Sequence, residues 1–152
     1  MQRTGTIRVA SYNVRKGMGT DRRRDPARTL EVVSRLGAQV VALQEADHRL
    51  APRPAALPPE AIAARTGLVP LRAPGAGPSL GHHGNALLVA PAIRPLRVEP
   101  LSLPHLEPRG ALLAELALPD GQALRVIAVH LGLLRRWRRE QLEHIARLLA
   151  AR

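Results

Sequence analysis

Apolar residues in this chain follow two different periods. Residues 7–14 form a short β-rich run, apolar residues recur at helical spacing over 26–36, and residues 40–43 are uninterrupted and apolar. Asp25-Pro26 is typical of a helix start, and Gly37 is typical of a helix end. The strand, the helix and the fully apolar strand together predict a right-handed βαβ unit with parallel strands.

The rest of the chain predicts mainly strands. A short helix is expected over 59–66, and strands are expected over 85–90, 96–101, 111–118 and 123–130. Asp120-Gly121 is a hairpin signal between the last two strands. A closing helix is expected to use Leu142, Ile145 and Leu149 as its apolar stripe. With no internal repeat and no linker, the sequence predicts one α/β domain whose mixed sheet is flanked by helices.

The charge of the chain is strongly positive. The formal net charge is +11, and Lys16 is the single lysine among the 23 basic residues. Positive charge favours polyanionic substrates through steering and counterion release. A GC-biased coding sequence would also yield this arginine-, proline- and alanine-rich composition, so a solvated basic surface is an equal alternative. Tyr12 and Trp137 are the only aromatic residues, which argues against a base-stacking platform.

Composition also restricts the cellular compartment that we expect for the protein. The sequence has no cysteine, which excludes disulfides and thiolate metal sites. Charge, proline or glycine interrupts every apolar stretch, so no membrane span is expected, and the N-terminus lacks the apolar segment of a signal peptide. We therefore expect a soluble, cytoplasmic protein.

Three of the expected strands end in a polar residue with catalytic potential: Asn13, Glu45 and His130. An amide, a carboxylate and an imidazole at one rim of a sheet are what a metal-assisted hydrolase needs. In the βαβ unit, Asn13 and Glu45 share the carboxyl rim, where open α/β sheets bind ligands. A carboxylate directly after a buried run favours pairing or metal binding, and a hard cation such as Mg²⁺ suits a sparse carboxylate set plus substrate phosphate oxygens.

Each of these residues also has an ordinary structural explanation. Taken alone, Glu45 is better explained by a solvated strand end paired with an arginine, and His130 by a ring with satisfied hydrogen bonds. Asn13 is also explained by a turn. Arg109 is either a bidentate phosphate clamp or one more surface arginine. The histidines of the segment 82–85 would point to opposite faces of a strand, which favours a loop that contacts substrate over a zinc pair.

Five segments in order resemble the endonuclease/exonuclease/phosphatase superfamily, in particular its small bacterial members related to DNase I and neutral sphingomyelinase. They are SYNVRKGMGTD, LGAQVVALQEAD, HHGNALLV, EPRGALLAEL and VIAVHLGL, and together they make residues 1–152 one domain of this kind. The resemblance implies a two-sheet α/β sandwich (DNase I-like), dependence on Mg²⁺ or Mn²⁺, and hydrolysis of phosphoester bonds by activated water.

The resemblance also implies roles for single residues. Glu45 matches the metal-binding glutamate, and Asn13 matches the asparagine that helps to position the metal site and a catalytic side chain. His130 matches the strand-end histidine that contacts the scissile phosphate, often described as an acid. Asn85 and Arg109 fall in segments that line the substrate groove.

The sequence departs from this pattern after its last helix. Members of the superfamily continue into a Gly-Asp-x-Asn segment and a Ser-Asp-His motif, and this sequence contains neither. Their Asp and His usually orient and activate the water. The expectation is therefore a C-terminally truncated domain that exposes the inner face of its sheet, is marginally stable and has little activity by itself.

The expected function is metal-dependent phosphoester hydrolysis, phosphodiesterase- or endonuclease-like. DNA is favoured on charge, while a phospholipid head group and a small phosphoester remain open. One alternative is a catalytically inactive basic fragment that binds polyanions. Another is a half-enzyme completed by a separate C-terminal half or by self-association through an exposed sheet face.

Overall fold

The computed structural model describes residues 5–105 and 109–152, so Glu107 and Pro108 lie outside the described residues. The elements in chain order are β1 (Val9–Asn13), the 3-10 helix η1 (Arg15–Gly17), α1 (Pro26–Arg35), β2 (Val40–Gln44), α2 (Pro59–Thr66), β3 (Val69–Pro70), β4 (Ala86–Val89), β5 (Arg94–Ser102), β6 (Gly110–Ala117), β7 (Ala123–Val129) and α3 (Arg135–Ala150). The short β3 and η1 were not expected from the sequence, and the other elements were. In the described part of the chain, no helix is both long and apolar enough to cross a lipid bilayer.

The strands form two sheets. The first has the order β1-β2-β4-β3, in which β1 and β2 are parallel and β4 is antiparallel to both of its neighbours. The second has the order β5-β6-β7 and is antiparallel throughout. The parallel pair confirms the βαβ unit, and the hairpin between β6 and β7 confirms the turn at Asp120-Gly121.

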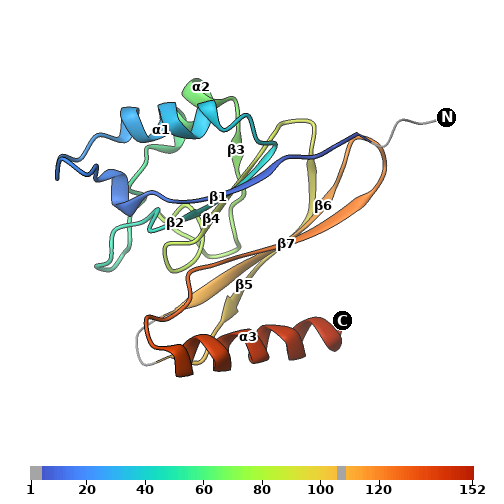
Figure 1. Ribbon diagram of the computed structural model, residues 1–152. Helices are drawn as coiled ribbons and strands as arrows, with labels where there is room; N and C mark the ends of the chain where they lie inside the picture. The colour runs from blue at the N-terminus through green and yellow to red at the C-terminus, as the bar shows by residue number, and fades with distance from the viewer. Residues whose placement is uncertain (1–4, 106–108) are drawn as a thin grey trace.

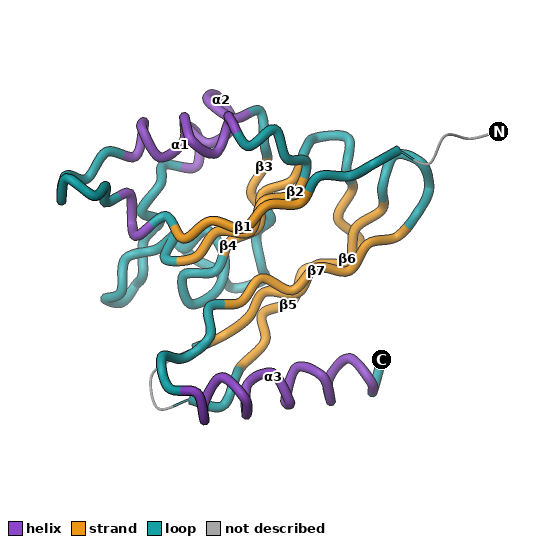
Figure 2. The backbone as a smooth tube through the Cα atoms, viewed as in Figure 1, coloured by secondary structure: helices purple, strands orange, loops and turns teal. Residues whose placement is uncertain are grey.

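The two sheets pack face to face between two layers of helices (Figures 1 and 2). α1 and α2 cover the outer face of the first sheet, and α3 covers the outer face of the second. Leu87 and Val89 of β4 meet Leu112 and Leu116 of β6 in the layer between the sheets. The result is the two-sheet α/β sandwich that the resemblance implied.

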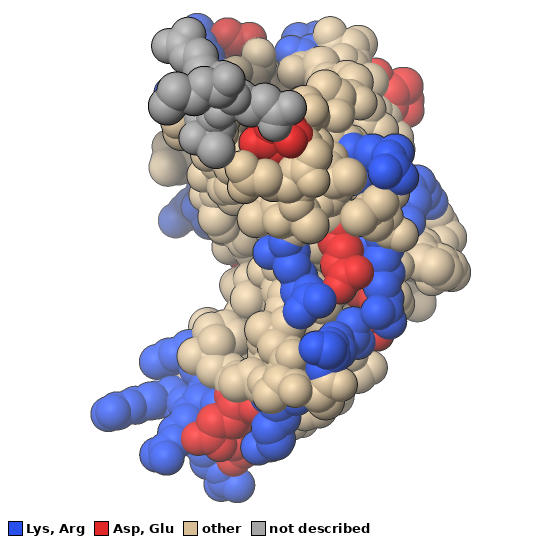
Figure 3. All heavy atoms as spheres, turned by 90° about the vertical axis from the view of Figure 1, so that its right-hand side faces the viewer, with Lys and Arg blue, Asp and Glu red and all other residues tan. Residues whose placement is uncertain are grey.

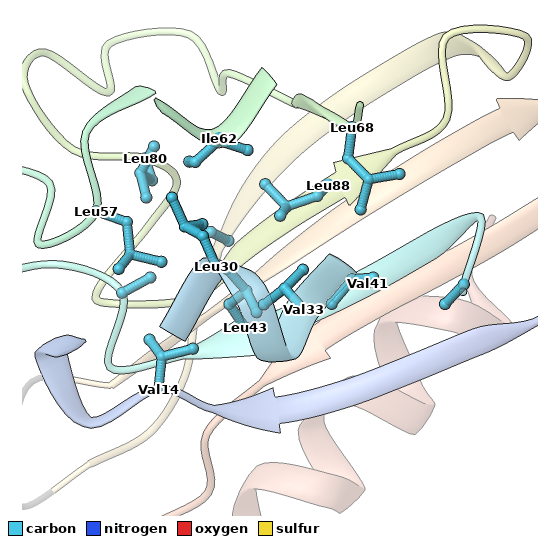
Figure 4. Close-up of a cluster of buried hydrophobic side chains, with 13 residues drawn as sticks. Val14, Leu30, Val33, Val41, Leu43, Leu57, Ile62, Leu68, Leu80 and Leu88 are labelled. Atoms are coloured by element: carbon cyan, nitrogen blue, oxygen red, sulfur yellow. The ribbon is translucent and has the colours of Figure 1, made fainter. Parts of the chain in front are cut away.

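Helix α1 begins where the sequence indicated. The Asp25 carboxylate accepts a hydrogen bond from the Arg28 backbone N–H at 3.0 Å, and Pro26 occupies the first turn. Leu30 and Val33 of α1 are fully buried against β2 (Figure 4). Every residue of β2 is buried, because helices cover one face of this strand and the second sheet covers the other.

Two expectations about packing were wrong. Leu142 of α3 is 52% exposed, and the helix instead packs on the second sheet through Ile145, Leu148 and Leu149. The inner face of the sheets is also not exposed, since Leu112 on the inward side of β6 has no solvent exposure. The first and second sheets bury each other, which the sequence alone does not reveal.

Sheet edges and a mixed-charge face remain open to solvent. β1 and β3 are the edges of the first sheet, β5 and β7 are the edges of the second, and Val9 of β1 is 50% exposed. On the face shown in Figure 3, basic and acidic side chains lie side by side on a largely uncharged surface. The positive charge of the chain is therefore not gathered into a single basic patch on this face.

Candidate functional site

The parallel pairing of β1 and β2 places Asn13 and Glu45 at one rim. Asn13 lies opposite Gln44 in the register, and the Val14 backbone N–H donates to the Gln44 carbonyl at 3.0 Å. Asn13 Nδ2 then donates to Glu45 Oε1 at 3.0 Å, as expected from their shared rim. The Asn13 Oδ1 accepts from the Arg15 backbone N–H at 3.0 Å, so this amide also fixes the loop that follows β1.

The backbone at this rim departs from ordinary strand geometry. Lys16 has φ of 56° and Glu45 has φ of 53°, in the left-handed region that side chains other than glycine rarely adopt. The Lys16 backbone N–H donates to the Glu45 carbonyl at 2.8 Å, so the two strained residues hold each other. Such strain persists where surrounding contacts impose it, and it is concentrated at functional sites.

Lys16 also pairs with Glu45 through its side chain. Lys16 Nζ lies 2.6 Å from Glu45 Oε2, and both side chains are 25% exposed. Burial raises the pKa of the Glu45 carboxyl, but the hydrogen bonds from Lys16 and Asn13 outweigh burial and hold this pKa below its ordinary value. Glu45 is therefore a carboxylate at neutral pH, with Asn13 on one oxygen and Lys16 on the other.

His130, directly after β7, lies beside Arg109. Arg109 Nη1 is 3.1 Å from His130 Nδ1, and a guanidinium only donates, so Nδ1 is the acceptor and the ring proton lies on Nε2. Burial lowers the pKa of His130, and the charge of Arg109 lowers it further. The ring is thus a neutral imidazole that can donate from Nε2.

These groups line one pocket of about 260 Å³ at the rim. Its lining residues are Lys16, Glu45, Asp47, His48, Arg49, Arg53, His83, Gly84, Arg109 and His130. Four side chains of permanent positive charge thus face two carboxylates, a balance that favours an anion. Three of the residues singled out from the sequence, Glu45, Arg109 and His130, meet here, while Asn13 supports Glu45 without lining the pocket.

Asn85 lies behind the pocket wall. It is 1% exposed, and its Nδ2 donates to the Gly110 carbonyl at 2.9 Å and to the His82 carbonyl at 3.2 Å. A Cβ added at Gly110 would lie 2.7 Å from His82 Nε2, so glycine is required where this ring packs. Asn85 therefore joins the loop that contains His82 to the start of β6. Its contact with substrate stays a prediction.

Asp47 is a pocket residue that the sequence analysis did not single out. It is 4% exposed, accepts from Ser79 Oγ at 2.5 Å and accepts from the Leu80 backbone N–H at 2.8 Å. Burial raises the pKa of this carboxyl above its ordinary value. Its position two residues after Glu45 was the only available signal. Asp47 anchors the loop that carries His83 and Gly84 to the pocket.

The half-buried His83 gives the fold a sensitivity to acid. Burial lowers the pKa of its ring to about 4, whereas an unperturbed histidine titrates near 6.5. A depressed base contributes stability that is complete above the unfolded pKa and is lost as pH falls to the folded pKa, because only the unfolded chain binds the proton between them.

We therefore expect the free energy of unfolding to fall by about 1–2 kcal/mol between roughly pH 6.5 and pH 4, a value reduced because the ring is partly exposed. Denaturant titrations across this range measure it. His83→Gln should reduce this fall, while the lowered pKa values of His82 and His130 keep part of it. An identical profile in that variant would show that another group is responsible.

The side chains at the rim that could hold a metal ion are few. In the ranges that the structure describes, no three side chains of the His, Cys, Asp and Glu types are placed to hold an ion together. A zinc site needs three or four such ligands, whereas Mg²⁺ keeps several waters and takes one or two carboxylates plus substrate oxygens. Glu45, with the Asn13 amide beside it, fits a hydrated hard cation.

The fold and the sequence both have known counterparts. Residues 10–152 match the family described as the Endonuclease/Exonuclease/phosphatase family. No curated protein matches the chain. Among solved structures, the endonuclease/exonuclease/phosphatase from Beutenbergia cavernae DSM 12333 superposes with a TM-score of 0.67 at 20% identity, over 91% of this chain and 43% of its own. TDP2 from C. elegans superposes with a TM-score of 0.65 at 13% identity, over 95% and 41%.

A truncated Caenorhabditis elegans TDP2 gives a TM-score of 0.60 at 13% identity, over 96% of this chain and 57% of its own. At these identities the likeness concerns the fold alone. The chain spans less than half the length of the first two of these structures. Since the family match covers nearly the whole sequence, the chain belongs to the endonuclease/exonuclease/phosphatase family.

Proposed function

We propose that this chain carries the phosphate-binding part of a phosphoester hydrolase that uses Mg²⁺ or Mn²⁺. The observation that supports it best is the convergence of Lys16, Glu45, Arg109 and His130 on one pocket from the ends of four strands, β1, β2, β6 and β7. Family membership supplies the reaction class, phosphoester hydrolysis. The substrate and the metal are our inference from the charge and the donor set of the pocket.

Each side chain has a task that follows from its environment. Glu45, with Asn13 beside it, would hold the cation, which when bound neutralises charge on phosphoryl oxygens. The guanidinium groups of three arginines in the pocket lining can bind a phosphate group: Arg49, Arg53 and Arg109. The neutral His130 ring, with its proton on Nε2, can donate to a phosphoryl or leaving oxygen, and Arg109 keeps the ring in that tautomer.

A phosphodiester is the substrate class that suits this pocket best. The pocket volume of about 260 Å³ admits a phosphate group with its immediate substituents, and the rest of a longer molecule would lie outside the pocket. A nucleic acid strand, a phospholipid head group and a small phosphodiester all share this group. We favour DNA because the chain carries a formal net charge of +11.

The test is hydrolysis of bis(p-nitrophenyl) phosphate and of plasmid DNA by the purified chain. Turnover should require Mg²⁺ or Mn²⁺ and stop on addition of EDTA. His130→Gln should lower the rate by about 100-fold, because Arg109 no longer fixes an Nε2–H donor toward the phosphoryl or leaving oxygen, and losing one such fixed donor costs about this factor. Turnover that persists in EDTA, or that is unchanged in His130→Gln, would contradict the proposal.

A second candidate is a site that binds phosphate here but needs further chain to turn over. β1 and β7 are among the four sheet edges in the described part of the fold, and the chain spans 43% of the Beutenbergia structure. The edges can pair with strands supplied by a C-terminal half or a second copy. This candidate predicts salt-sensitive DNA binding without turnover, and turnover on mixing with the completing segment.

A further inference from the structure

The single lysine of this chain stands on the carboxylate of the candidate site. Every other basic residue among the 23 is arginine, yet the residue against Glu45 is Lys16. The two side groups differ physically. A guanidinium forms a planar fork that grips both oxygens of a carboxylate, whereas an ammonium is a compact charge on a flexible stem. The only basic residue that is not arginine therefore lies at a position where the positive group must be able to leave its carboxylate partner.

Each oxygen of the Glu45 carboxylate accepts a hydrogen bond from a different side chain. Lys16 Nζ bonds Oε2 at 2.6 Å, and Asn13 Nδ2 bonds Oε1 at 3.0 Å. The Lys16 backbone is fixed independently by its N–H bond to the Glu45 carbonyl at 2.8 Å. The ammonium can thus leave Oε2 without any change in the main chain.

The pocket also offers the ammonium a second place. Lys16 lines the same cavity as Arg49, Arg53 and Arg109, where a phosphate group would lie. The Lys16 side chain is 25% exposed, so moving it does not strand a charge in an apolar interior. Anionic oxygens on a bound phosphate would replace the carboxylate as its partner.

We propose that Lys16 is a tethered cation that occupies Glu45 until a divalent metal ion binds there, and that then contacts the phosphate of the substrate. This inference rests on the proposed function of the site. One carboxylate serves two cations in turn, so metal binding and the positioning of Lys16 toward phosphate are coupled. Lys16 in this view sets the metal affinity and contributes to phosphate binding, while Glu45 remains the metal ligand.

Because Lys16 is the only lysine, lysine labelled with ¹³C at Cε gives one side-chain signal in an NMR spectrum. In the free chain this signal should be that of an ordered, ion-paired group. Titration with Mg²⁺ should shift it and increase its mobility, with the same midpoint as metal binding measured by calorimetry. Inorganic phosphate added to the Mg²⁺-loaded chain should order it again.

Variants separate occupancy of the carboxylate from a general effect of charge. Lys16→Met should strengthen Mn²⁺ binding by about tenfold, the factor expected if the ion pair holds Glu45 about nine-tenths of the time. Arg49→Met removes a charge from the same pocket and should change the Mn²⁺ affinity by only about twofold. Lys16→Arg keeps the charge and should bind Mn²⁺ more weakly than the natural chain.

The results of these experiments separate a failure of this inference from a failure of the proposed function. If Mn²⁺ binds the natural chain but the lysine signal does not move, Lys16 is not exchanged and the inference is wrong while the proposed function stands. Equal Mn²⁺ affinities for Lys16→Met and Arg49→Met would also overturn it. If Mg²⁺ and Mn²⁺ bind neither the natural chain nor Lys16→Met, both the inference and the proposed metal site fail.

Discussion

Glu45→Gln is expected to reduce Mn²⁺ binding and any metal-dependent hydrolysis by at least about 100-fold. The amide keeps the size of the side chain and can still accept from Asn13, but it lacks the negative charge that a hard cation requires. Charge stabilisation by a metal in such a site is worth several kcal/mol, which corresponds to a factor of this size or more. Isothermal calorimetry with Mn²⁺ and the hydrolysis of bis(p-nitrophenyl) phosphate measure the two losses.

The variant should keep its fold. Gln keeps the hydrogen bond from Asn13, and the Lys16 ammonium can reach the solvent of the pocket that it lines, so its charge is not left unpaired in an apolar interior. Glu31→Gln removes the same charge from the exposed face of α1, where Glu31 pairs with Arg35, and serves as the control. It should bind Mn²⁺ like the natural chain. Normal Mn²⁺ binding by a folded Glu45→Gln protein would show that the metal site lies elsewhere.

The part of the site that the sequence predicted depends on local rules. A continuous apolar run followed by Glu45, and a β-rich run ending at Asn13, place both residues at strand ends. Parallel strands put those ends at one rim, and the bond between Asn13 and Glu45 follows. The period of the apolar pattern, the length of each apolar run and the direction of the strands were sufficient here, because each can be inferred from residues close together in the sequence.

The remainder of the site depends on backbone geometry and long-range packing. Lys16 reaches Glu45 only because both residues adopt left-handed φ, which no propensity of lysine or glutamate favours. Arg109 and His130 meet because β6 and β7 pair in a particular register, and that pairing places the start of β6 beside the end of β7. The sequence shows that Lys16 is the only lysine, but it does not show that Glu45 is its partner.

Packing between layers was also beyond the sequence. The apolar spacing in α3 fitted Leu142 as well as Leu148, and only the position of the helix on the second sheet selects Leu148. Likewise, the expectation of an open sheet face assumed that one sheet lacked a cover. The burial of Leu112 shows that each sheet covers the other within this chain.

Asp47→Ala is expected to destabilise the fold by about 2–4 kcal/mol. The change removes the acceptor for the Ser79 hydroxyl and for the Leu80 backbone N–H, and an unsatisfied buried donor costs about 1–3 kcal/mol. Asp47 is 4% exposed, so its hydrogen bonds are largely shielded from bulk water. Since domains of this size are stable by only about 5–15 kcal/mol, urea unfolding should show the loss clearly.

Asp47→Asn provides the matched control, and it should be as stable as the natural chain at neutral pH or slightly more stable. An asparagine oxygen can accept from the Leu80 N–H, while its amide can donate to Ser79 Oγ. Burial raises the pKa of Asp47, so its contribution to stability is complete below the unfolded pKa and is lost as pH rises through the folded one. The advantage of asparagine should therefore be largest at neutral pH and shrink on acidification.

The pair of variants tests what holds the pocket wall. If Asp47 anchors the loop at Ser79 and Leu80 by hydrogen bonds alone, alanine loosens the loop and asparagine preserves it. Hydrogen exchange of the Leu80 amide should accelerate in Asp47→Ala and stay slow in Asp47→Asn. Equal destabilisation by both variants would instead show that the negative charge is required. Asp47 would then belong with Glu45 in the electrostatics of the metal site, because both carboxylates line the pocket.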